Sequence, residues 1–213
     1  LFGAALMLVG ILALYFRSDP RTFDLTALGQ MSRGADLAAV LTFLFLFTIG
    51  GFSGLMLAIA PADFQYQDTY FVVAHFHYVL VPGAVFSIMA AVYYWLPKWT
   101  GHMYSMSLAK WHFWLSTIFV NVLFFPQHFL GLAGMPRRIP DYAVQFADWN
   151  MVSSLGAFGF GLSQILFAIV IIQCVKGGAK ATDQVWDANP RGLEWTLPSP
   201  APYHSFQTAP EIK

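Results

Sequence analysis

The sequence carries very little charge. Its 213 residues include 11 Lys and Arg and 11 Asp and Glu, so charged residues make up 10% of the chain and the formal net charge is zero. Soluble globular domains are about one quarter charged, which makes an ordinary water-soluble domain a poor fit. The lack of a basic surplus also argues against a nucleic-acid partner.

Cysteine is almost absent as well. The single residue Cys174 excludes a disulfide framework and any multi-cysteine metal site within this chain. Hydrophobic residues make up 57% of the sequence and aromatic residues 17%, which excludes a disordered chain. The chain begins at Leu1 with no charged segment ahead of its first apolar run, so we expect the N-terminal part of a longer protein to be missing.

Long runs without charge predict membrane-spanning helices. A helix needs about 20 apolar residues to cross a bilayer, and uncharged runs of that length occupy residues 37–62, 69–97, 111–136 and 149–175. These runs do not alternate as the strands of a membrane barrel do. We therefore predict an all-α membrane protein, with a helical domain over residues 1–176 and an extended tail over residues 177–213. Its spanning helices, about five in number, are expected near residues 1–16, 37–60, 69–97, 107–128 and 147–175.

Basic residues between these helices predict the orientation of the chain. Lys and Arg concentrate on the cytoplasmic side of membrane proteins. That rule places the first loop, the third loop and the tail in the cytoplasm, because their basic residues are Arg17, Arg21, Arg33, Lys98, Lys110, Lys176 and Lys180. The second loop carries the acids Asp63 and Asp68 and no base, so it is expected outside.

Two histidines within the predicted helix 69–97 are candidate cofactor ligands. Ionisable groups inside a bilayer are costly and are functional candidates by default. His75 and His77 are two positions apart, a rotation of about 200° on a helix, so they point to opposite sides and cannot easily bind one ion. Either each imidazole only bonds to a backbone carbonyl or to a Ser or Thr of a neighbouring helix, or each holds its own metal centre with Phe76 between them. Neutral imidazole is a common axial ligand of haem iron.

An adjacent pair of arginines, Arg137 and Arg138, lies on the predicted outer side, against the positive-inside rule. The nearby Asp141 and Asp148 could neutralise the pair, or the arginines could bind an anion. Haem carries two propionates, and guanidinium groups match carboxylates in charge and geometry. The histidines lie near the outer end of their helix, so two bound haems would explain the histidine and the arginine pairs together.

Several motifs resemble subunit I of the haem-copper terminal oxidases, and within it the C-terminal part of the bacterial aa3-type cytochrome c oxidases. The resemblance runs from about residue 41 to the end of the chain. Its motifs, in the order of the family, are FLFTIGG (45–51), DTYFVVAHFHY (68–78), FFPQHFLG (124–131), GMPRR (134–138), LEW (193–195) and PYH (202–204).

The resemblance implies a role for each candidate residue. His75 corresponds to the axial ligand of a high-spin haem of the a3 type, and His77 to a ligand of a low-spin haem a. Phe76 corresponds to a residue between the two haems, and Arg137 and Arg138 to arginines that hold haem propionates. The chain would then supply the last helices of a twelve-helix bundle, with copper ligands outside it.

A magnesium site and a second acid are also implied. Asp68 corresponds to a magnesium ligand and Asp63 to an acid near the propionates. Gln67 stands where the family usually has His, and its amide oxygen remains a suitable magnesium ligand. Residues 1–34 carry no motif of the family, so no site is placed there.

The implied function is that of a terminal oxidase in the bacterial inner membrane, with a cytoplasmic tail. Electrons from cytochrome c would reduce molecular oxygen to water, coupled to proton translocation, with oxidase subunits II and III as partners. This fragment alone is expected to be inactive. One alternative is a quinol-oxidising relative, although such relatives tend to have Asn at the position of Tyr78 and Thr at that of Pro136. Alternatives from other classes are a proton-coupled transporter and a structural membrane subunit.

Overall fold

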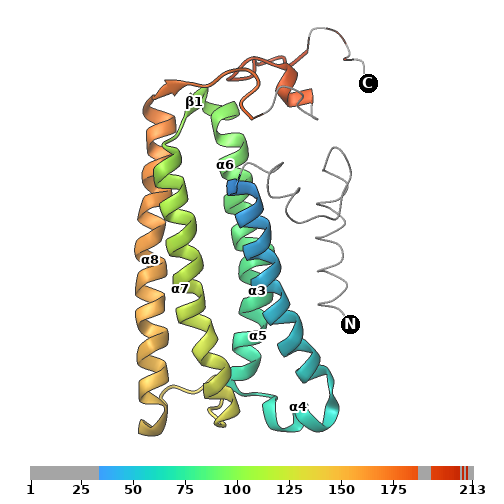
Figure 1. The fold of residues 1–213 in the computed structure, drawn as a ribbon, viewed down its shortest axis with the longest axis vertical. Coiled ribbons are helices and arrows are strands. Elements are labelled where there is room, and N and C mark those ends of the chain that lie inside the picture. The colour runs from blue at the N-terminus through green and yellow to red at the C-terminus, as the bar shows by residue number, and fades with distance from the viewer. Residues whose placement is uncertain (1–33, 187–192, 207, 209, 211–213) are drawn as a thin grey trace. The chain divides into compact units, whose positions relative to one another are not determined.

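Helices make up most of the described chain. The computed structural model describes residues 34–186, 193–206, 208 and 210. The helix expected at residues 1–16 lies outside the described residues. Figure 1 shows the helices α3 (Gly34–Ala58), α4 (Ala60–Tyr66), α5 (Tyr70–Leu80), α6 (Ser87–Thr100), α7 (Met106–Leu132) and α8 (Ala147–Lys176), with the π-helix η1 (Val81–Phe86) between α5 and α6. The short elements are the 3-10 helices η2 (Val144–Phe146) and η3 (Leu193–Thr196) and the strands β1 (His102–Met103) and β2 (Ala179–Lys180).

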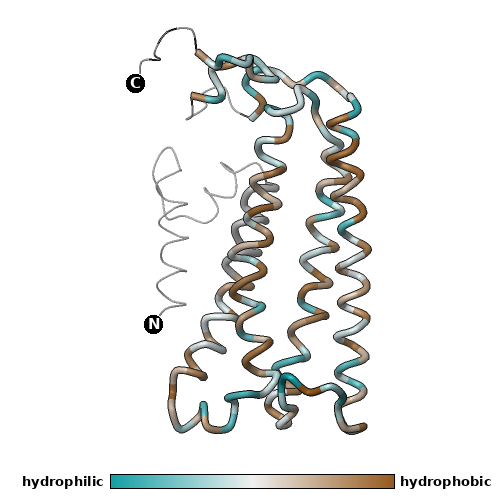
Figure 2. The backbone as a smooth tube through the Cα atoms, turned by 180° about the vertical axis from the view of Figure 1, so that it is seen from behind, coloured by the Kyte–Doolittle hydropathy of each residue, from teal (hydrophilic) through white to brown (hydrophobic). Residues whose placement is uncertain are grey.

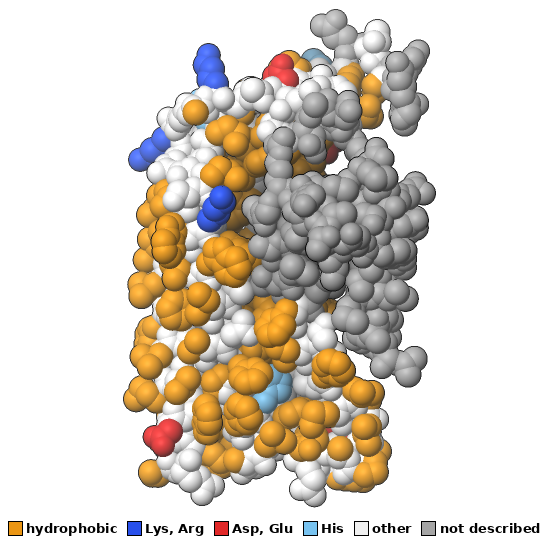
Figure 3. Space-filling view, viewed as in Figure 1, with side chains coloured by type: hydrophobic (Ala, Val, Ile, Leu, Met, Phe, Trp, Pro, Cys, Tyr) orange, Lys and Arg blue, Asp and Glu red, His pale blue; other side chains and the backbone are white. Residues whose placement is uncertain are grey.

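Within the described residues, three helical segments are long and apolar enough to cross a membrane: Tyr70–Thr100, Met106–Leu132 and Val144–Lys176. A fourth span is counted if the bent pair Phe45–Ala58 and Ala60–Tyr66 is taken as one. Apolar residues follow the helices in Figure 2, while hydrophilic residues gather in the connections. On the face shown in Figure 3, hydrophobic side chains cover much of the described surface and charged ones are few. The prediction of an all-α membrane protein is confirmed.

The stretch predicted as one helix at residues 37–60 is followed by a sharp bend. Helix α3 ends at Ala58, and α4 leaves it at 105°. Ile59 has an extended backbone, with φ −86° and ψ 103°, and Pro61 stands in the first turn of α4. Proline lacks the N–H that a continuous helix needs, and its ring would clash with the preceding turn. The proline therefore favours a new helix over an extension of α3.

The described residues form two compact units, one made of those within 34–87 and 115–161 and the other of those within 88–114 and 162–210. In the first unit, α3 packs against α5. Helix α7 also approaches α5 closely, since a Cβ on Gly131 of α7 would fall on the backbone of Phe71 at the start of α5. Small residues let the backbones of membrane helices approach in this way.

In the second unit, the tail packs onto the end of α6. Lys98 is only 3% exposed, and its Nζ donates to the carbonyl oxygens of Asp183 (3.1 Å) and Leu197 and to the hydroxyl of Ser199 (3.3 Å). Strand β2 pairs antiparallel with β1. The described tail therefore combines extended chain with short regular elements, and three of its oxygen atoms accept from the buried Lys98 of α6.

The contact at Gly131 generates a stability prediction. We expect Gly131→Ala to destabilise the protein by about 1–3 kcal/mol, the usual cost of overpacking, because the added Cβ meets backbone that can move only with α5. Thermal unfolding in detergent would measure the loss. Gly161→Ala is the matched control, since nothing lies within 4 Å of the Cβ it would add. Equal unfolding temperatures for the two variants would contradict the prediction.

Candidate haem-binding site

Helix α5 carries the two histidines and begins at a well-defined cap. The Thr69 hydroxyl accepts a hydrogen bond from the backbone N–H of Phe71 at 3.2 Å, as an N-cap residue does. His75 and His77 follow within the next two turns. Their spacing of two residues turns them about 200° apart on this regular helix. Each imidazole therefore has its own environment.

The His75 ring is held against α3. Its Nδ1 lies 2.8 Å from the carbonyl oxygen of Gly50 and 3.2 Å from the hydroxyl oxygen of Ser53. Because a carbonyl can only accept a hydrogen bond, Nδ1 must carry the proton. The Nε2 lone pair then remains available. Gly54 makes room for the ring, since a Cβ there would lie 2.6 Å from His75 Cε1.

His77 has the same arrangement, with the partner in its own helix. Its Nδ1 donates to the carbonyl oxygen of Val73 at 2.8 Å. The ring stacks on Phe124 of α7, with centroids 4.1 Å apart and planes 13° from parallel. The centroid of the Phe76 ring lies 4.3 Å from that of the His77 ring. This histidine, too, has its proton on Nδ1 and its Nε2 lone pair free.

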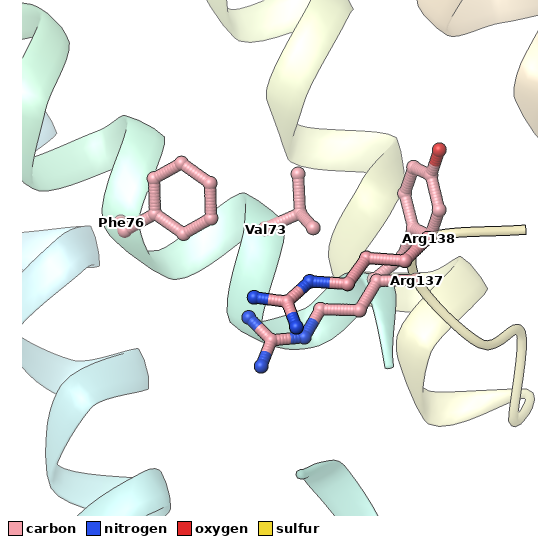
Figure 4. A pocket seen from close by; sticks show the side chains of 5 residues that line it. Val73, Phe76, Arg137 and Arg138 are labelled. Atoms are coloured by element: carbon pink, nitrogen blue, oxygen red, sulfur yellow. The ribbon is translucent and has the colours of Figure 1, made fainter. Parts of the chain in front are cut away.

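Both arginines line a cleft beside the start of α5. The cleft has a volume of about 280 Å³, and its lining residues are Tyr70, Val73, Phe76, Arg137 and Arg138. Figure 4 shows the two guanidinium groups close together and reaching toward α5. Tyr70, Val73 and His77 share one face of that helix by their spacing of three and four residues. The arginines therefore lie along the face that carries His77.

The acid that pairs with Arg137 is Asp68. Its Oδ1 accepts from Nη2 of Arg137 at 2.7 Å and from Nε at 3.0 Å. The backbone reinforces this contact, because the N–H of Arg137 donates to the carbonyl oxygen of Asp68 at 2.8 Å. Within the described residues, neither Asp141 nor Asp148 forms an ion pair with an arginine. Of the two alternatives for the arginines, pairing with Asp141 and Asp148 is therefore not what the structure shows, because the fold brings Asp68 to Arg137 instead.

The arrangement fits two haem groups. Metal-binding histidines usually donate their other ring N–H to a carbonyl or carboxylate, which fixes the tautomer and leaves the ligating nitrogen free. Both histidines meet this requirement. Two neighbouring guanidinium groups with one carboxylate leave an excess of positive charge, which favours a bound anion such as a propionate.

Comparisons with known proteins agree with this chemistry. The family model described as "Cytochrome C and Quinol oxidase polypeptide I" matches residues 20–159. The chain belongs to this family. The matched region begins at residue 20, ahead of the motifs named above. It therefore includes part of residues 1–34, in which no motif of the family was found.

Two relatives are both cytochrome c oxidase subunit 1. The protein from Cereibacter sphaeroides is 50% identical over 184 residues, which are 86% of this chain and 32% of the relative. The protein from Yarrowia lipolytica is 47% identical over 184 residues, covering 79% of this chain and 34% of the relative. The chain thus spans about one third of the length of these oxidase subunits.

The other residues expected at sites of an oxidase subunit I lie outside the cleft. Asp63 is half-buried in the first turn of α4, and its carbonyl oxygen accepts from the N–H of Gln67 at 2.7 Å. Asp68, the expected magnesium ligand, is 74% exposed beside Arg137. Within the described residues, no group of three or more His, Cys, Asp or Glu side chains could hold a metal ion. The magnesium site stays a prediction.

The residues of α3 that fix the orientation of the His75 ring were not predicted from the sequence. Gly50, Ser53 and Gly54 lie one helical turn or less apart on α3 and all contact that imidazole or its Nδ1. Small residues spaced three or four apart on a membrane helix often mark close helix packing. That spacing was a usable signal, although it could not have shown which side chain packs there.

Gly54 offers a direct test of the His75 geometry. We expect Gly54→Ala to weaken haem binding at His75 by about 10- to 100-fold, the usual effect of disturbing the partners of a metal ligand, because the added methyl displaces the ring. Haem content and the carbon monoxide difference spectrum of the full-length protein would measure this. Gly161→Ala serves again as the control, and unchanged haem content in Gly54→Ala would contradict the placement of the ring.

Proposed function

We propose that this chain is the C-terminal part of subunit I of a terminal oxidase that transfers electrons from cytochrome c to molecular oxygen, with coupled proton translocation. In this proposal it binds a low-spin haem a and a high-spin haem a3, and copper is held by ligands outside the chain. When bound, the haems and copper supply the electron transfer and oxygen reduction. The observation that carries the proposal is that both intramembrane histidines donate from Nδ1 to carbonyl oxygens and keep Nε2 free.

In this proposal, some residues of the chain bind the haem irons and others bind the haem propionates. His75, whose Nδ1 bonds to α3, would hold the high-spin haem, and His77, on the face of α5 that leads to the arginine cleft, would hold the low-spin haem. Phe76 lies between the two ligands and is 40% exposed. Arg137 and Arg138 bind propionates, with Asp68 keeping Arg137 in place. Arginine suits this task because its charge persists at all physiological pH values.

Membership of the family and the identity of single residues support the electron donor, the partner subunits and the membrane location that we propose. Tyr78 and Pro136 favour cytochrome c over quinol as the donor, and both named relatives are cytochrome c oxidase subunits. Such subunits would work with oxidase subunits II and III. We place the protein in a bacterial inner membrane with a cytoplasmic tail, on the grounds of its similarity to a bacterial relative and of the loop charges. A cofactor-free transporter is disfavoured, because the family is one of oxidases.

Removing each histidine separately tests the two ligand assignments. We expect His77→Ala to lose the low-spin haem band, because the substitution removes the ligand proposed for that haem. His75→Ala should lose the haem that binds carbon monoxide and keep the low-spin band. Reduced-minus-oxidised and carbon monoxide difference spectra of the full-length complex distinguish the two. A variant that keeps the complete spectrum would show that its histidine is not a ligand.

The arginine cleft tests the low-spin assignment independently. We expect Arg138→Gln to lower the midpoint potential of the low-spin haem, because a nearby positive charge favours the reduced, more negative state. Arg138→Lys should keep the potential closer to that of the wild type. Spectroelectrochemical titration measures both. Equal potentials in all three proteins would place Arg138 away from the haem.

A further inference from the structure

The Nδ1 atom of His75 faces two oxygens from a single turn of α3. The Gly50 carbonyl oxygen lies at 2.8 Å and the Ser53 hydroxyl oxygen at 3.2 Å. Ser53 is only 5% exposed, so water does not readily compete for these groups. His77 differs, because its Nδ1 donates to the carbonyl oxygen of Val73 in its own helix.

The protons of this cluster can be assigned from its acceptors. The Gly50 carbonyl has no proton to give, so the hydrogen between it and Nδ1 belongs to His75. The Ser53 hydroxyl lies 3.0 Å from each of two carbonyl oxygens, those of Ile49 and Gly50. Its single proton goes to one of these, because serine in a helix commonly donates back to the preceding turn. The Ser53 oxygen therefore presents a lone pair to the Nδ1–H of His75.

We propose that Ser53 is a positioning residue for the haem ligand His75. Its hydroxyl oxygen accepts a share of the Nδ1 hydrogen bond, which fixes the plane of the ring and increases the electron density on Nε2. Partners of this kind raise the basicity of a metal-binding histidine. This inference rests on the proposed function, in which His75 binds the high-spin haem.

Gly54 completes the restraint. The ring lies so close to α3 that a Cβ at position 54 would clash with it. The imidazole can therefore rotate only by breaking its contacts with the Gly50 carbonyl and the Ser53 hydroxyl. The geometry thus couples the high-spin ligand to a neighbouring helix, whereas the low-spin ligand is bonded within α5 and stacked on Phe124. A change in the α3–α5 packing would therefore act directly on the hydrogen bonds of His75, whereas the Nδ1 bond of His77 is made within α5.

The test compares Ser53→Thr with Ser53→Val in the full-length complex. These two side chains have nearly the same shape, and threonine keeps the hydroxyl that valine replaces by a methyl group. The measurement is the iron–histidine stretching band of the reduced high-spin haem by resonance Raman spectroscopy. We expect the threonine variant to match the wild type and the valine variant to shift to lower frequency, because the lost acceptor weakens the electron donation from Nε2 to iron.

Controls separate this effect from general damage. The low-spin haem band should stay unchanged in both variants. Ser87→Val removes a hydroxyl that donates to a backbone carbonyl (that of Pro82, at 3.3 Å) without an imidazole partner, and should leave the stretching band in place. If the valine variant fails to assemble, Ser53→Ala removes the hydroxyl with less added volume and should give the same shift.

The possible failures are distinguishable. Identical bands in the threonine, valine and alanine variants would overturn the role of Ser53, while His75 would remain the ligand. Retention of the wild-type band in His75→Ala would instead overturn the assignment of His75 on which the proposal rests.

Discussion

The need to satisfy every polar group inside a membrane shapes the whole site. An imidazole in an apolar helix must give its N–H to some acceptor, and both histidines of α5 give it to a backbone carbonyl. That choice leaves each Nε2 unprotonated, on opposite sides of one helix. The geometry of the carbonyl partners therefore decides where each Nε2 points. For His75 the partner lies on α3, so the orientation of this ring depends on the close packing of α3 against α5.

The arginine cleft depends on a second constraint, which is held by the backbone. The residues just before α5 pair with those after α7, through the Thr69–Pro136 bridge and the N–H of Tyr70 donating to the Met135 carbonyl at 3.0 Å. The ion pair between Asp68 and Arg137 lies at the end of this pairing. The positive groups are thus fixed relative to the same helix that carries His77. Ligand and counter-ions need this shared frame if one rigid cofactor is to contact both.

Much of the fold class could be predicted, because it follows from local properties. Charge-free runs of sufficient length indicate helices in a membrane whatever their neighbours are. The bend at Ile59 was missed, although Pro61 was visible, because a proline inside a long apolar run can kink a helix, end it or start a new one. The tight contact at Gly131 could not be predicted, since the glycine gives no sign of which backbone will approach it.

For the site, the sequence by itself determined which residues could bind iron and that His75 and His77 must face opposite ways, because helical periodicity is a property of the chain alone. It also identified Arg137 and Arg138 as an anomaly of charge. Only the tertiary structure decided that Asp68, rather than Asp141 or Asp148, pairs with Arg137, and that Gly50, Ser53 and Gly54 surround the His75 ring. These contacts join segments far apart in the chain, and the packing of helices, which periodicity does not specify, brings them together.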